Sequence, residues 1–167
     1  MTDKIVLYEK DGPIGLITIN RPDVKNALNL NVFRALNDML DDIAKDDDVR
    51  AIIITGAGSA FVAGADINDL LAFDSIEGWS ASRFQQSVFN KLEKLGRPSI
   101  AAINGAALGG GLELALSCTF RIASAKVRMG FPELGLGIIP AFGGTERLVR
   151  TIGHAKAAEL ILFRSMI

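Results

Sequence analysis

Two uninterrupted apolar runs on either side of an amphipathic segment constrain the fold of this chain more than any other feature. Residues 50–55 (RAIIIT) and 99–103 (SIAAI) carry apolar side chains at successive positions, which is typical of buried strands covered on both faces. Between them, residues from about 80 to 95 place apolar side chains on one side of a helix. Strand, helix and strand in this order predict parallel strands joined by a right-handed crossover, and therefore an α/β fold.

The remaining segments extend the same pattern over the chain. Asp11, Gly12 and Pro13 separate two short runs and predict the turn of a hairpin. With 167 residues, the chain is long enough for one domain with a sizeable core, and its sequence contains no strong internal repeat. The further predicted elements are hairpin strands at 5–9 and 14–20, helices at 29–44, 112–118, 145–151 and 155–163, and a strand at 120–124.

Composition and charge argue against several classes of partner. Hydrophobic residues make up 49% of the chain and charged residues 22%, with a formal net charge of −1. Because acidic and basic residues are interleaved, we expect neither nucleic acid nor a membrane as partner. No apolar run approaches the roughly 18 residues of a membrane span, and the first residues lack the apolar core of a signal peptide. A single cysteine, Cys118, fits a reducing compartment, so the sequence predicts a cytoplasmic protein.

Common catalytic motifs match this sequence poorly. Residues 56–61 (GAGSAF) follow an apolar run, but a dinucleotide-binding fingerprint needs a third glycine where Phe61 stands. No glycine is followed by Lys and then Ser or Thr, as a phosphate-binding P-loop requires. His154 is the only histidine, which argues against a histidine triad or a histidine-based metal site. Cys118 is interpreted as a small buried residue rather than a nucleophile.

Three other segments combine glycines, small residues and carboxylates. Residues 61–66 (FVAGAD) form a small-residue loop whose backbone N–H groups a ligand can approach closely. Three glycines at 109–111 precede a helix that bears Glu113, and a helix N-terminus offers free N–H donors. Residues 129–145 place Glu133 behind a proline in a glycine-rich loop. Each segment has an ordinary alternative, namely a tight turn, a helix-dipole carboxylate and a solvated loop acid.

Taken together, these segments resemble the crotonase superfamily, specifically its enoyl-CoA hydratases. The matching stretches are NRPDVKNALN (20–29), FVAGADI (61–67), AAINGAALGGGLELAL (101–116) and FPELGLGIIPAFGGTERL (131–148), in the family's order and at about its usual spacing. The resemblance covers essentially the whole chain. It implies one crotonase-like domain over residues 1–167, built as a spiral of repeated ββα units. It also implies acyl-CoA thioesters as substrates, in the setting of fatty-acid β-oxidation.

The resemblance also implies roles for individual residues. The N–H groups of Ala65 and Gly110 match the oxyanion hole that binds the thioester oxygen as it gains negative charge. Glu113 and Glu133 match the two glutamates that hold one water beside the double bond. Because two neighbouring carboxylates do not both ionise easily, one should hold a proton near neutral pH. We expect Glu133 to deliver the α-carbon proton and Glu113 to handle the water, in a reversible syn addition.

Other positions match the part of the family site that holds coenzyme A. Lys25 stands where a basic residue often approaches the CoA phosphates, and a solvated lysine is the alternative. Coenzyme A belongs to the substrate, so we expect no separate cofactor and no metal. The residues expected to line the CoA moiety, mostly through backbone groups, are Ala63, Asp66, Ile67, Asn68 and Gly109.

Two residues and the length depart from the family pattern. Thr119 stands where many relatives have an aspartate, and Phe142 is bulky for its turn; both bear on packing or on the shape of the acyl pocket. Family members usually continue into a helical C-terminal region that covers the acyl pocket and packs subunits into trimers or hexamers. That region is absent from the 167 residues, so either the chain is a fragment or another chain takes the place of the region. For the full-length protein, we expect a homo-oligomer, a trimer or a hexamer.

Alternative functions stay open at this point. A Δ3-Δ2-enoyl-CoA isomerase shares the scaffold but often keeps one acid, so the presence of both Glu113 and Glu133 favours a hydratase. Other acyl-CoA specialists, dehalogenase-like or carnitinyl-CoA dehydratase-like, differ in acyl specificity, which depends on residues 68–80 and on the missing region. A non-catalytic CoA-binding or RNA-binding member is the alternative from another class. The mixed surface charge and the intact glutamate pair weigh against it.

Overall fold

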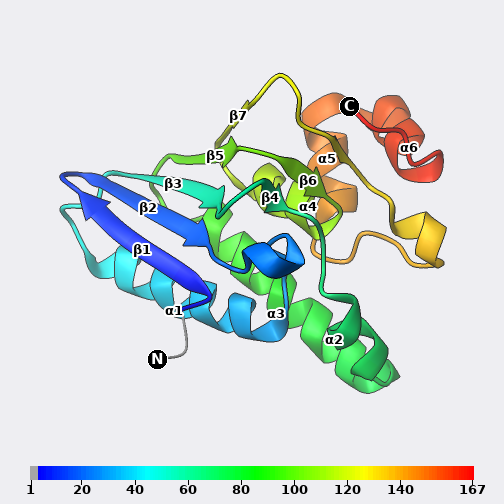
Figure 1. Cartoon of the computed structure of the whole chain (residues 1–167), viewed down its shortest axis with the longest axis horizontal. Helices are drawn as coiled ribbons and strands as arrows, with labels where there is room; N and C mark the ends of the chain where they lie inside the picture. The colour runs from blue at the N-terminus through cyan, green and yellow to red at the C-terminus, as the bar shows by residue number, and fades with distance from the viewer. Residues whose placement is uncertain (1–3) are drawn as a thin grey trace.

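Five strands form the larger of two sheets in the computed structural model, which describes residues 4–167 (Figure 1). In sheet order they are β1 (Val6–Asp11), β2 (Ile14–Ile19), β3 (Ala51–Gly56), β5 (Ser99–Ile103) and β7 (Phe120–Ala123). β1 and β2 pair antiparallel, whereas β2, β3, β5 and β7 run parallel. The predicted hairpin, the three predicted parallel strands and the α/β class are therefore confirmed.

Gly12 adopts φ of +55°, a left-handed value open to glycine, and so forms the predicted hairpin turn between β1 and β2.

The strands of this sheet are less enclosed than the sequence predicts. In β3, Ile52 and Ile54 are fully buried, but the residues that alternate with them, Ala51, Ile53 and Thr55, are only half-buried. The prediction that residues 50–55 are covered on both faces was wrong, because the helices cover one face and the other face is partly open.

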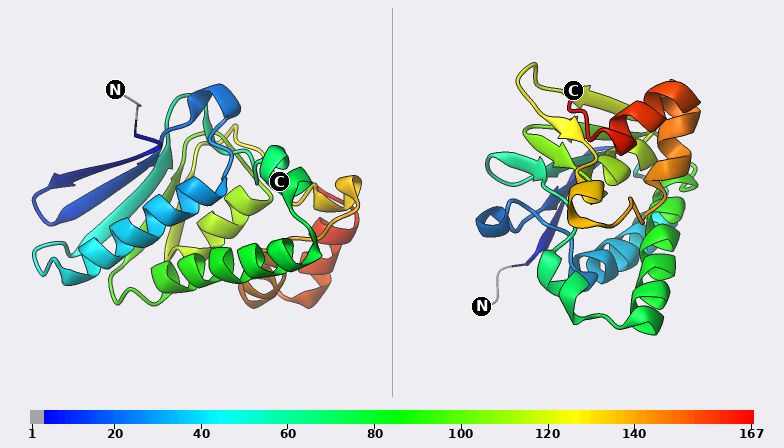
Figure 2. Two further views of the ribbon diagram at one scale, coloured as in Figure 1. Left: turned by 90° about the horizontal axis from the view of Figure 1, so that it is seen from below. Right: turned by 90° about the vertical axis from the view of Figure 1, so that its right-hand side faces the viewer.

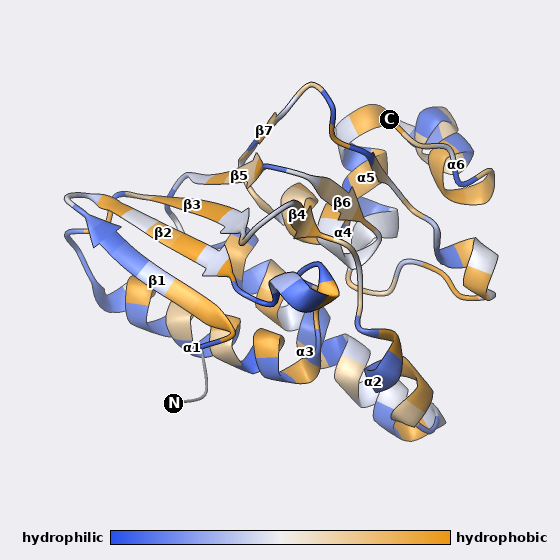
Figure 3. Ribbon diagram, in the orientation of Figure 1, coloured by the Kyte–Doolittle hydropathy of each residue, from blue (hydrophilic) through white to orange (hydrophobic). Residues whose placement is uncertain are grey.

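Two long helices, α1 (Leu30–Lys45) and α3 (Ser75–Glu93), lie side by side against one face of this sheet (Figures 1 and 2). Asn29 begins the first of them, since its side chain accepts a hydrogen bond from the N–H of Val32 at 3.0 Å. The apolar residues of α1 form one stripe, seen in Figure 3 as orange bands among blue ones. The helix predicted at 29–44 is thus confirmed.

The second long helix begins earlier than residue 80, where the sequence places it. The side chain of Asp74 accepts hydrogen bonds from the N–H groups of Ile76 and Glu77, and Glu77 accepts one from the N–H of Asp74. This capping box fixes the helix start at residue 75. A short helix, α2 (Ile67–Ala72), precedes it and was not predicted, because six residues are too few to show helical periodicity.

A second sheet contains three short strands that the sequence does not predict. They are β4 (Ala60–Val62), β6 (Ala106–Leu108) and β8 (Met129–Gly130), which pair parallel in this order. β4 includes the start of FVAGAD, which was wrongly interpreted as a loop throughout. Each short strand follows a strand of the larger sheet and is followed by a helical segment. This is the expected spiral of ββα units, with a repeat in topology rather than in sequence.

The remaining helical segments are η1 (Pro22–Val24), α4 (Gly110–Ser117), η2 (Glu133–Leu136), α5 (Gly144–Ile152) and α6 (His154–Leu162). α4 is enclosed on all sides, because every one of its residues is buried. α5 and α6 lie together at the end of the molecule that also carries the C-terminus (Figure 1). There Met129 and Ile167 exchange backbone hydrogen bonds. Over residues 4–167, no helix has the length and apolar character needed to cross a membrane.

Candidate active site

Three segments that the sequence singles out meet at one edge of the small sheet. Ala65 follows β4, Gly110 follows β6 and Glu133 follows β8. Because these strands are parallel neighbours, their carboxyl ends lie together, which is where α/β proteins commonly bind ligands. Glu113 joins the group from the first turn of α4. The fold therefore brings together the four residues expected to carry the chemistry.

The backbone nitrogens of Ala65 and Gly110 are neighbours at this edge. A Cβ built on Gly110 would lie 3.5 Å from the nitrogen of Ala65. Leu28 pairs with the residues on either side of Ala65, accepting from the N–H of Asp66 and donating to the carbonyl of Gly64. In the part of the chain that the structure describes, neither the Ala65 nor the Gly110 N–H donates a hydrogen bond. Two adjacent donors are thus available to one acceptor.

Close contacts explain the glycine run. Gly109 adopts φ of +50° with ψ of −120°, a conformation that strains residues with a side chain. A Cβ on Gly111 would lie 2.0 Å from the carbonyl oxygen of Val62, so α4 packs backbone against backbone on β4. Gly110 lies between these two glycines in the sequence. It begins α4, so the positive end of the helix dipole lies at its N–H.

Glu113 is 1% exposed and is held by two backbone donors. Its Oε1 accepts hydrogen bonds from the N–H groups of Phe142 and Gly144, both at 2.7 Å. Burial raises the pKa of Glu113 to about 7, while the two N–H donors act against that rise and the nearby Glu133 adds to it. The carboxyl is thus poised to change its protonation state near neutral pH.

Glu133 lies against Gly109, the first glycine of the run. A Cβ on Gly109 would lie 2.5 Å from Oε1 of this glutamate. Its Oε2 is buried and, among residues 4–167, has no hydrogen-bond partner. Burial raises the pKa of Glu133 above its ordinary value. A buried carboxyl oxygen without a donor favours the neutral acid over the anion.

The two glutamates therefore differ in their hydrogen-bond partners, although burial raises the pKa of both. Glu113 has two donors that stabilise an anion, whereas Glu133 has an oxygen with none. Paired carboxyls with distinct environments are the usual arrangement for combined acid and base catalysis. Beside them lie two N–H donors suited to an oxygen that gains negative charge. The site can therefore move protons on a substrate while it stabilises an oxyanion.

Comparison with known proteins assigns the family. A model of the enoyl-CoA hydratase/isomerase family matches residues 9–167. The chain belongs to this family. It is 48% identical over 157 residues to the short-chain-enoyl-CoA hydratase of Clostridium acetobutylicum, a match that covers 93% of this chain and 60% of the relative. It is 43% identical over 157 residues to the crotonyl-CoA hydratase of Syntrophomonas wolfei, again covering 93% and 60%.

The fold is also that of solved members of the enoyl-CoA hydratase/isomerase family. The crystal structure of enoyl-CoA hydratase from Bacillus anthracis superposes with a TM-score of 0.94 at 37% identity, over 98% of this chain and 64% of that chain. This match confirms the crotonase-like fold. The chain spans about three fifths of the length of the curated relatives it matches.

A buried arginine, which the sequence analysis missed, supports the loop that holds Glu113 in this family member. Arg147 is 4% exposed and donates to the carbonyl oxygen of Phe142 and to the carboxylate of Glu93, both at 2.9 Å. It also donates to the side-chain oxygen of Asn90. The signal that would have revealed it is a charged residue on the buried face of a helix, where it needs partners.

A second missed residue, Asn26, ties the NRPDVKNALN segment to β4. It is fully buried and adopts φ of +61°. Its side-chain nitrogen donates to the carbonyl oxygens of Ala57 and Ala60 at 2.8 Å, and its side-chain oxygen accepts from the N–H of Arg21 at 2.9 Å. Asparagine is among the few residues that tolerate such a φ. An asparagine in this loop is therefore the sequence feature that could have revealed its structural role.

The predicted CoA-contacting residues Lys25 and Ala63 are neighbours in the structure. The N–H of Ala63 donates to the carbonyl oxygen of Lys25 at 3.0 Å, so the two segments share one edge of the site. The Lys25 residue is exposed and lies at the end of η1 with φ of +52°. Its position fits either a phosphate contact or a solvated lysine, and its role stays a prediction.

The side chain of Asp66 is engaged within the protein rather than free for a ligand. Its Oδ2 pairs with Arg21 at 2.9 Å, and its Oδ1 accepts from the N–H of Asn68 at 3.2 Å as the cap of α2. Ile67 and Asn68 begin α2, and Ile67 is 55% exposed. Contact of these residues with the CoA moiety stays a prediction.

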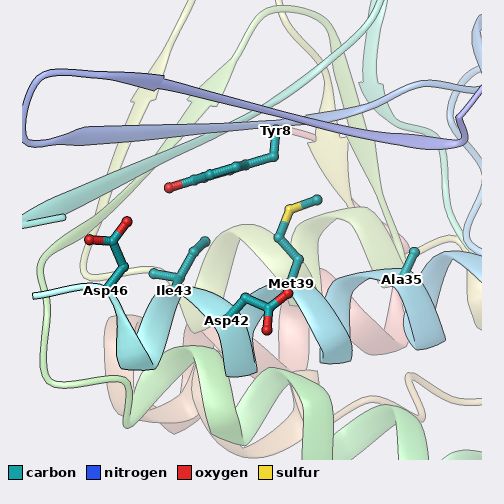
Figure 4. A pocket seen from close by; sticks show the side chains of 6 residues that line it. All are labelled: Tyr8, Ala35, Met39, Asp42, Ile43 and Asp46. Carbon is teal, nitrogen blue, oxygen red and sulfur yellow. The ribbon is translucent and has the colours of Figure 1, made fainter. Parts of the chain in front are cut away.

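A separate cavity of about 300 Å³ lies between β1 and α1 (Figure 4). Tyr8 extends over it from the hairpin, and Met39 and Ile43 line it from the helix (Figure 4). Two carboxylates, those of Asp42 and Asp46, also line it, and none of the predicted site residues does. Both carboxylates are paired with lysines, Asp46 with Lys10 at 2.7 Å and Asp42 with Lys45 at 3.8 Å. The edge of the small sheet is the better candidate site.

The residues considered for other chemistries have structural explanations. His154 begins α6 and is exposed, as expected for a helix-start residue. Cys118 is 4% exposed, and burial raises the pKa of its thiol to about 12, which makes it a poor nucleophile. Thr119 and Ser99 exchange hydrogen bonds at 3.0 and 3.1 Å between backbone N–H and hydroxyl groups. The Thr119 departure is thus a packing feature of the strands β5 and β7.

Proposed function

We propose that this chain carries an enoyl-CoA hydratase site that adds water reversibly to the double bond of a trans-2-enoyl-CoA thioester. The observation that supports it most is the buried pair Glu113 and Glu133 beside two backbone N–H groups that donate to no acceptor among residues 4–167. Membership of the enoyl-CoA hydratase/isomerase family makes an acyl-CoA thioester the fitting substrate class. Relatives named short-chain-enoyl-CoA hydratase and crotonyl-CoA hydratase support a short acyl chain.

In this proposal, the N–H groups of Ala65 and Gly110 form the oxyanion hole. The thioester carbonyl oxygen accepts from both, so the enolate formed during the reaction has its negative charge between two fixed donors. Gly110 has no side chain to obstruct the thioester, and Gly109 leaves room for the carboxyl of Glu133 beside it. The CoA moiety then extends toward Lys25, Ala63 and the start of α2.

The two glutamates divide the proton transfers. The Glu113 carboxylate accepts a proton from the bound water as the water oxygen forms its bond to the β-carbon. The electrons of the double bond move onto the thioester and give the enolate. Glu133 then donates its proton to the α-carbon, and the enolate collapses to the 3-hydroxyacyl thioester. Both protein groups approach from one side, which gives a syn addition. Reversal of the same steps dehydrates the product.

We further propose that the full-length protein is a homo-oligomer, a trimer or a hexamer. Large apolar side chains near the end of α6 are exposed, with Leu162 at 62% and Phe163 at 76%, which is typical of surfaces that contact another subunit. Size-exclusion chromatography with light scattering on the full-length protein tests this proposal, and a monomer would contradict it. The cytoplasmic location predicted from the sequence also stays a prediction.

The reaction class is tested by incubating the purified chain with crotonyl-CoA and, separately, with a trans-3-enoyl-CoA. A hydratase gives a product heavier by one water from crotonyl-CoA, seen by mass spectrometry together with loss of the conjugated thioester absorbance. An isomerase instead produces that absorbance from the 3-enoyl substrate without a change in mass. Binding of both thioesters by folded protein, with neither conversion, would contradict the proposal and favour a non-catalytic CoA-binding protein.

A further inference from the structure

The ring of Phe142 lies against the backbone position that would bind the thioester. A Cβ on Gly110 would come within 2.8 and 3.0 Å of two ring carbons of Phe142, and within 3.5 Å of the Ala65 nitrogen. The ring therefore touches Gly110 on the same side as the neighbouring donor. An acyl chain that leaves the oxyanion donors must pass this ring.

The same ring lines a cavity of about 280 Å³. Leu70 and Phe73 contribute from α2 and the residue after it, and Ile138 contributes from the loop before α5. Gln85 of α3 lines it too. Because Phe142 contacts Gly110 and also borders this cavity, its ring stands between the thioester position and the largely apolar space beyond.

Phe142 is held firmly in this place. It is 4% exposed, and its ring packs edge-on against Phe33 and Phe89, with centroids 5.2 and 6.1 Å away. Its N–H donates to Glu113 and its carbonyl oxygen accepts from Arg147. A ring fixed at both its backbone and its faces does not swing aside easily for a longer substrate.

We propose that Phe142 is the specificity-determining residue of the site: its ring closes the acyl side and restricts the substrate to short acyl chains. This inference rests on the proposed function, since it presumes that the thioester oxygen lies between Ala65 and Gly110. When a smaller side chain replaces Phe142, the acyl side of the site opens into the cavity beyond it. Longer acyl chains then find apolar space in which each buried methylene tightens binding about fourfold.

The test measures dissociation constants of butyryl-, hexanoyl- and octanoyl-CoA by calorimetry, which needs no turnover. The proteins are the unmodified chain, Phe142→Ala, the milder Phe142→Leu in case the first does not fold, and Phe163→Ala. Phe163 is 76% exposed and serves as a matched phenylalanine control outside the site.

The expected result is that octanoyl-CoA binds the unmodified chain and Phe163→Ala no more tightly than butyryl-CoA does. In Phe142→Ala, the preference for octanoyl- over butyryl-CoA should rise by about tenfold or more, and Phe142→Leu should show a smaller rise, largest for hexanoyl-CoA. The same preference in all folded proteins, with thioesters bound, overturns this inference alone. Failure of the folded, unmodified chain to bind any of the three thioesters overturns the proposed function as well.

Discussion

The guanidinium of Arg147 donates a hydrogen bond at 2.9 Å to the carbonyl oxygen of Phe142, the residue whose N–H holds Glu113. One peptide segment thus links a buried cation to a buried carboxyl. Arg147 also lies near enough to Glu113 to favour its anion. The charge that α5 buries is therefore part of the support for the proposed base.

Removing the Arg147 guanidinium should destabilise the protein through these bonds. We expect Arg147→Met to lower the free energy of unfolding by about 2–4 kcal/mol, because it leaves the Phe142 carbonyl oxygen without its side-chain donor and Glu93 with only one of its two arginine partners. Arg147→Lys should recover only part of this loss, since lysine lacks the forked donor geometry. Arg150→Ala is the control: Arg150 also pairs with Glu93 but is 54% exposed, and its loss should cost less than about 1 kcal/mol. Urea denaturation measures all three, and equal losses would refute the network.

Stability should depend on pH through Glu113. Burial raises its pKa from 4.5 to about 7, so between these values the folded state holds a proton that the unfolded chain has released. The free energy of unfolding therefore falls as pH rises from about 4.5 to 7, by about 3 kcal/mol for this group. Glu113→Gln keeps an oxygen for both N–H donors and should lose this dependence. Denaturant titrations at pH 5 and pH 8 compare the two proteins, and parallel pH curves would count against the assignment.

The neighbouring glycines should respond differently to alanine. Gly111→Ala places a Cβ 2.0 Å from the Val62 carbonyl oxygen, so the backbone must move and stability should fall by about 3 kcal/mol or more. Gly110→Ala places a Cβ 2.8 Å from a ring carbon of Phe142, so the packed ring must shift and stability should also fall, but by less than in Gly111→Ala because no backbone atom has to move. Turnover in Gly110→Ala should nevertheless drop about 10²-fold, because the methyl obstructs the oxyanion position. Thermal melts and hydration rates, measured together, separate the two effects; full activity in Gly110→Ala would place the oxyanion elsewhere.

Asn26 offers a test of how the site loop is positioned. Asn26→Ala removes two donated bonds and one accepted bond and leaves the carbonyl oxygens of Ala57 and Ala60 without this donor. A loss of about 2–3 kcal/mol is expected in chemical denaturation. Asn26→Asp keeps the acceptor but faces those carbonyl oxygens with a carboxylate, and should be at least as destabilising. A neutral effect of both substitutions would show that the loop needs no such tie.

The sequence predicts the strands and helices that carry a strong apolar pattern, such as the unbroken run that includes Ile52 and Ile54 and the apolar stripe of α1. It does not predict β4, β6 and β8, which are two or three residues long and too short to carry a pattern. It also misplaces the start of α3, since the capping box at Asp74 was overlooked.

The site shows a similar division. Four motifs identify Glu113, Glu133, Ala65 and Gly110 as candidates, and the fold brings them to one edge. Sequence spacing alone does not reveal that Glu113 receives two N–H donors from a loop near residue 143, or that Arg147 holds the same loop. Such contacts join residues far apart in the chain, and only the packing of α4 against α5 establishes them.

The most direct test of the account compares crotonyl-CoA hydration by the unmodified chain, Glu113→Gln and Glu133→Gln. Hydration is followed as loss of the conjugated thioester absorbance, with binding of butyryl-CoA measured in parallel. The two-glutamate mechanism predicts turnover by the unmodified chain. In each variant the hydration rate should fall by about 10²- to 10⁴-fold while butyryl-CoA still binds. Rates within a few-fold of the unmodified chain in either variant would contradict the two-glutamate mechanism.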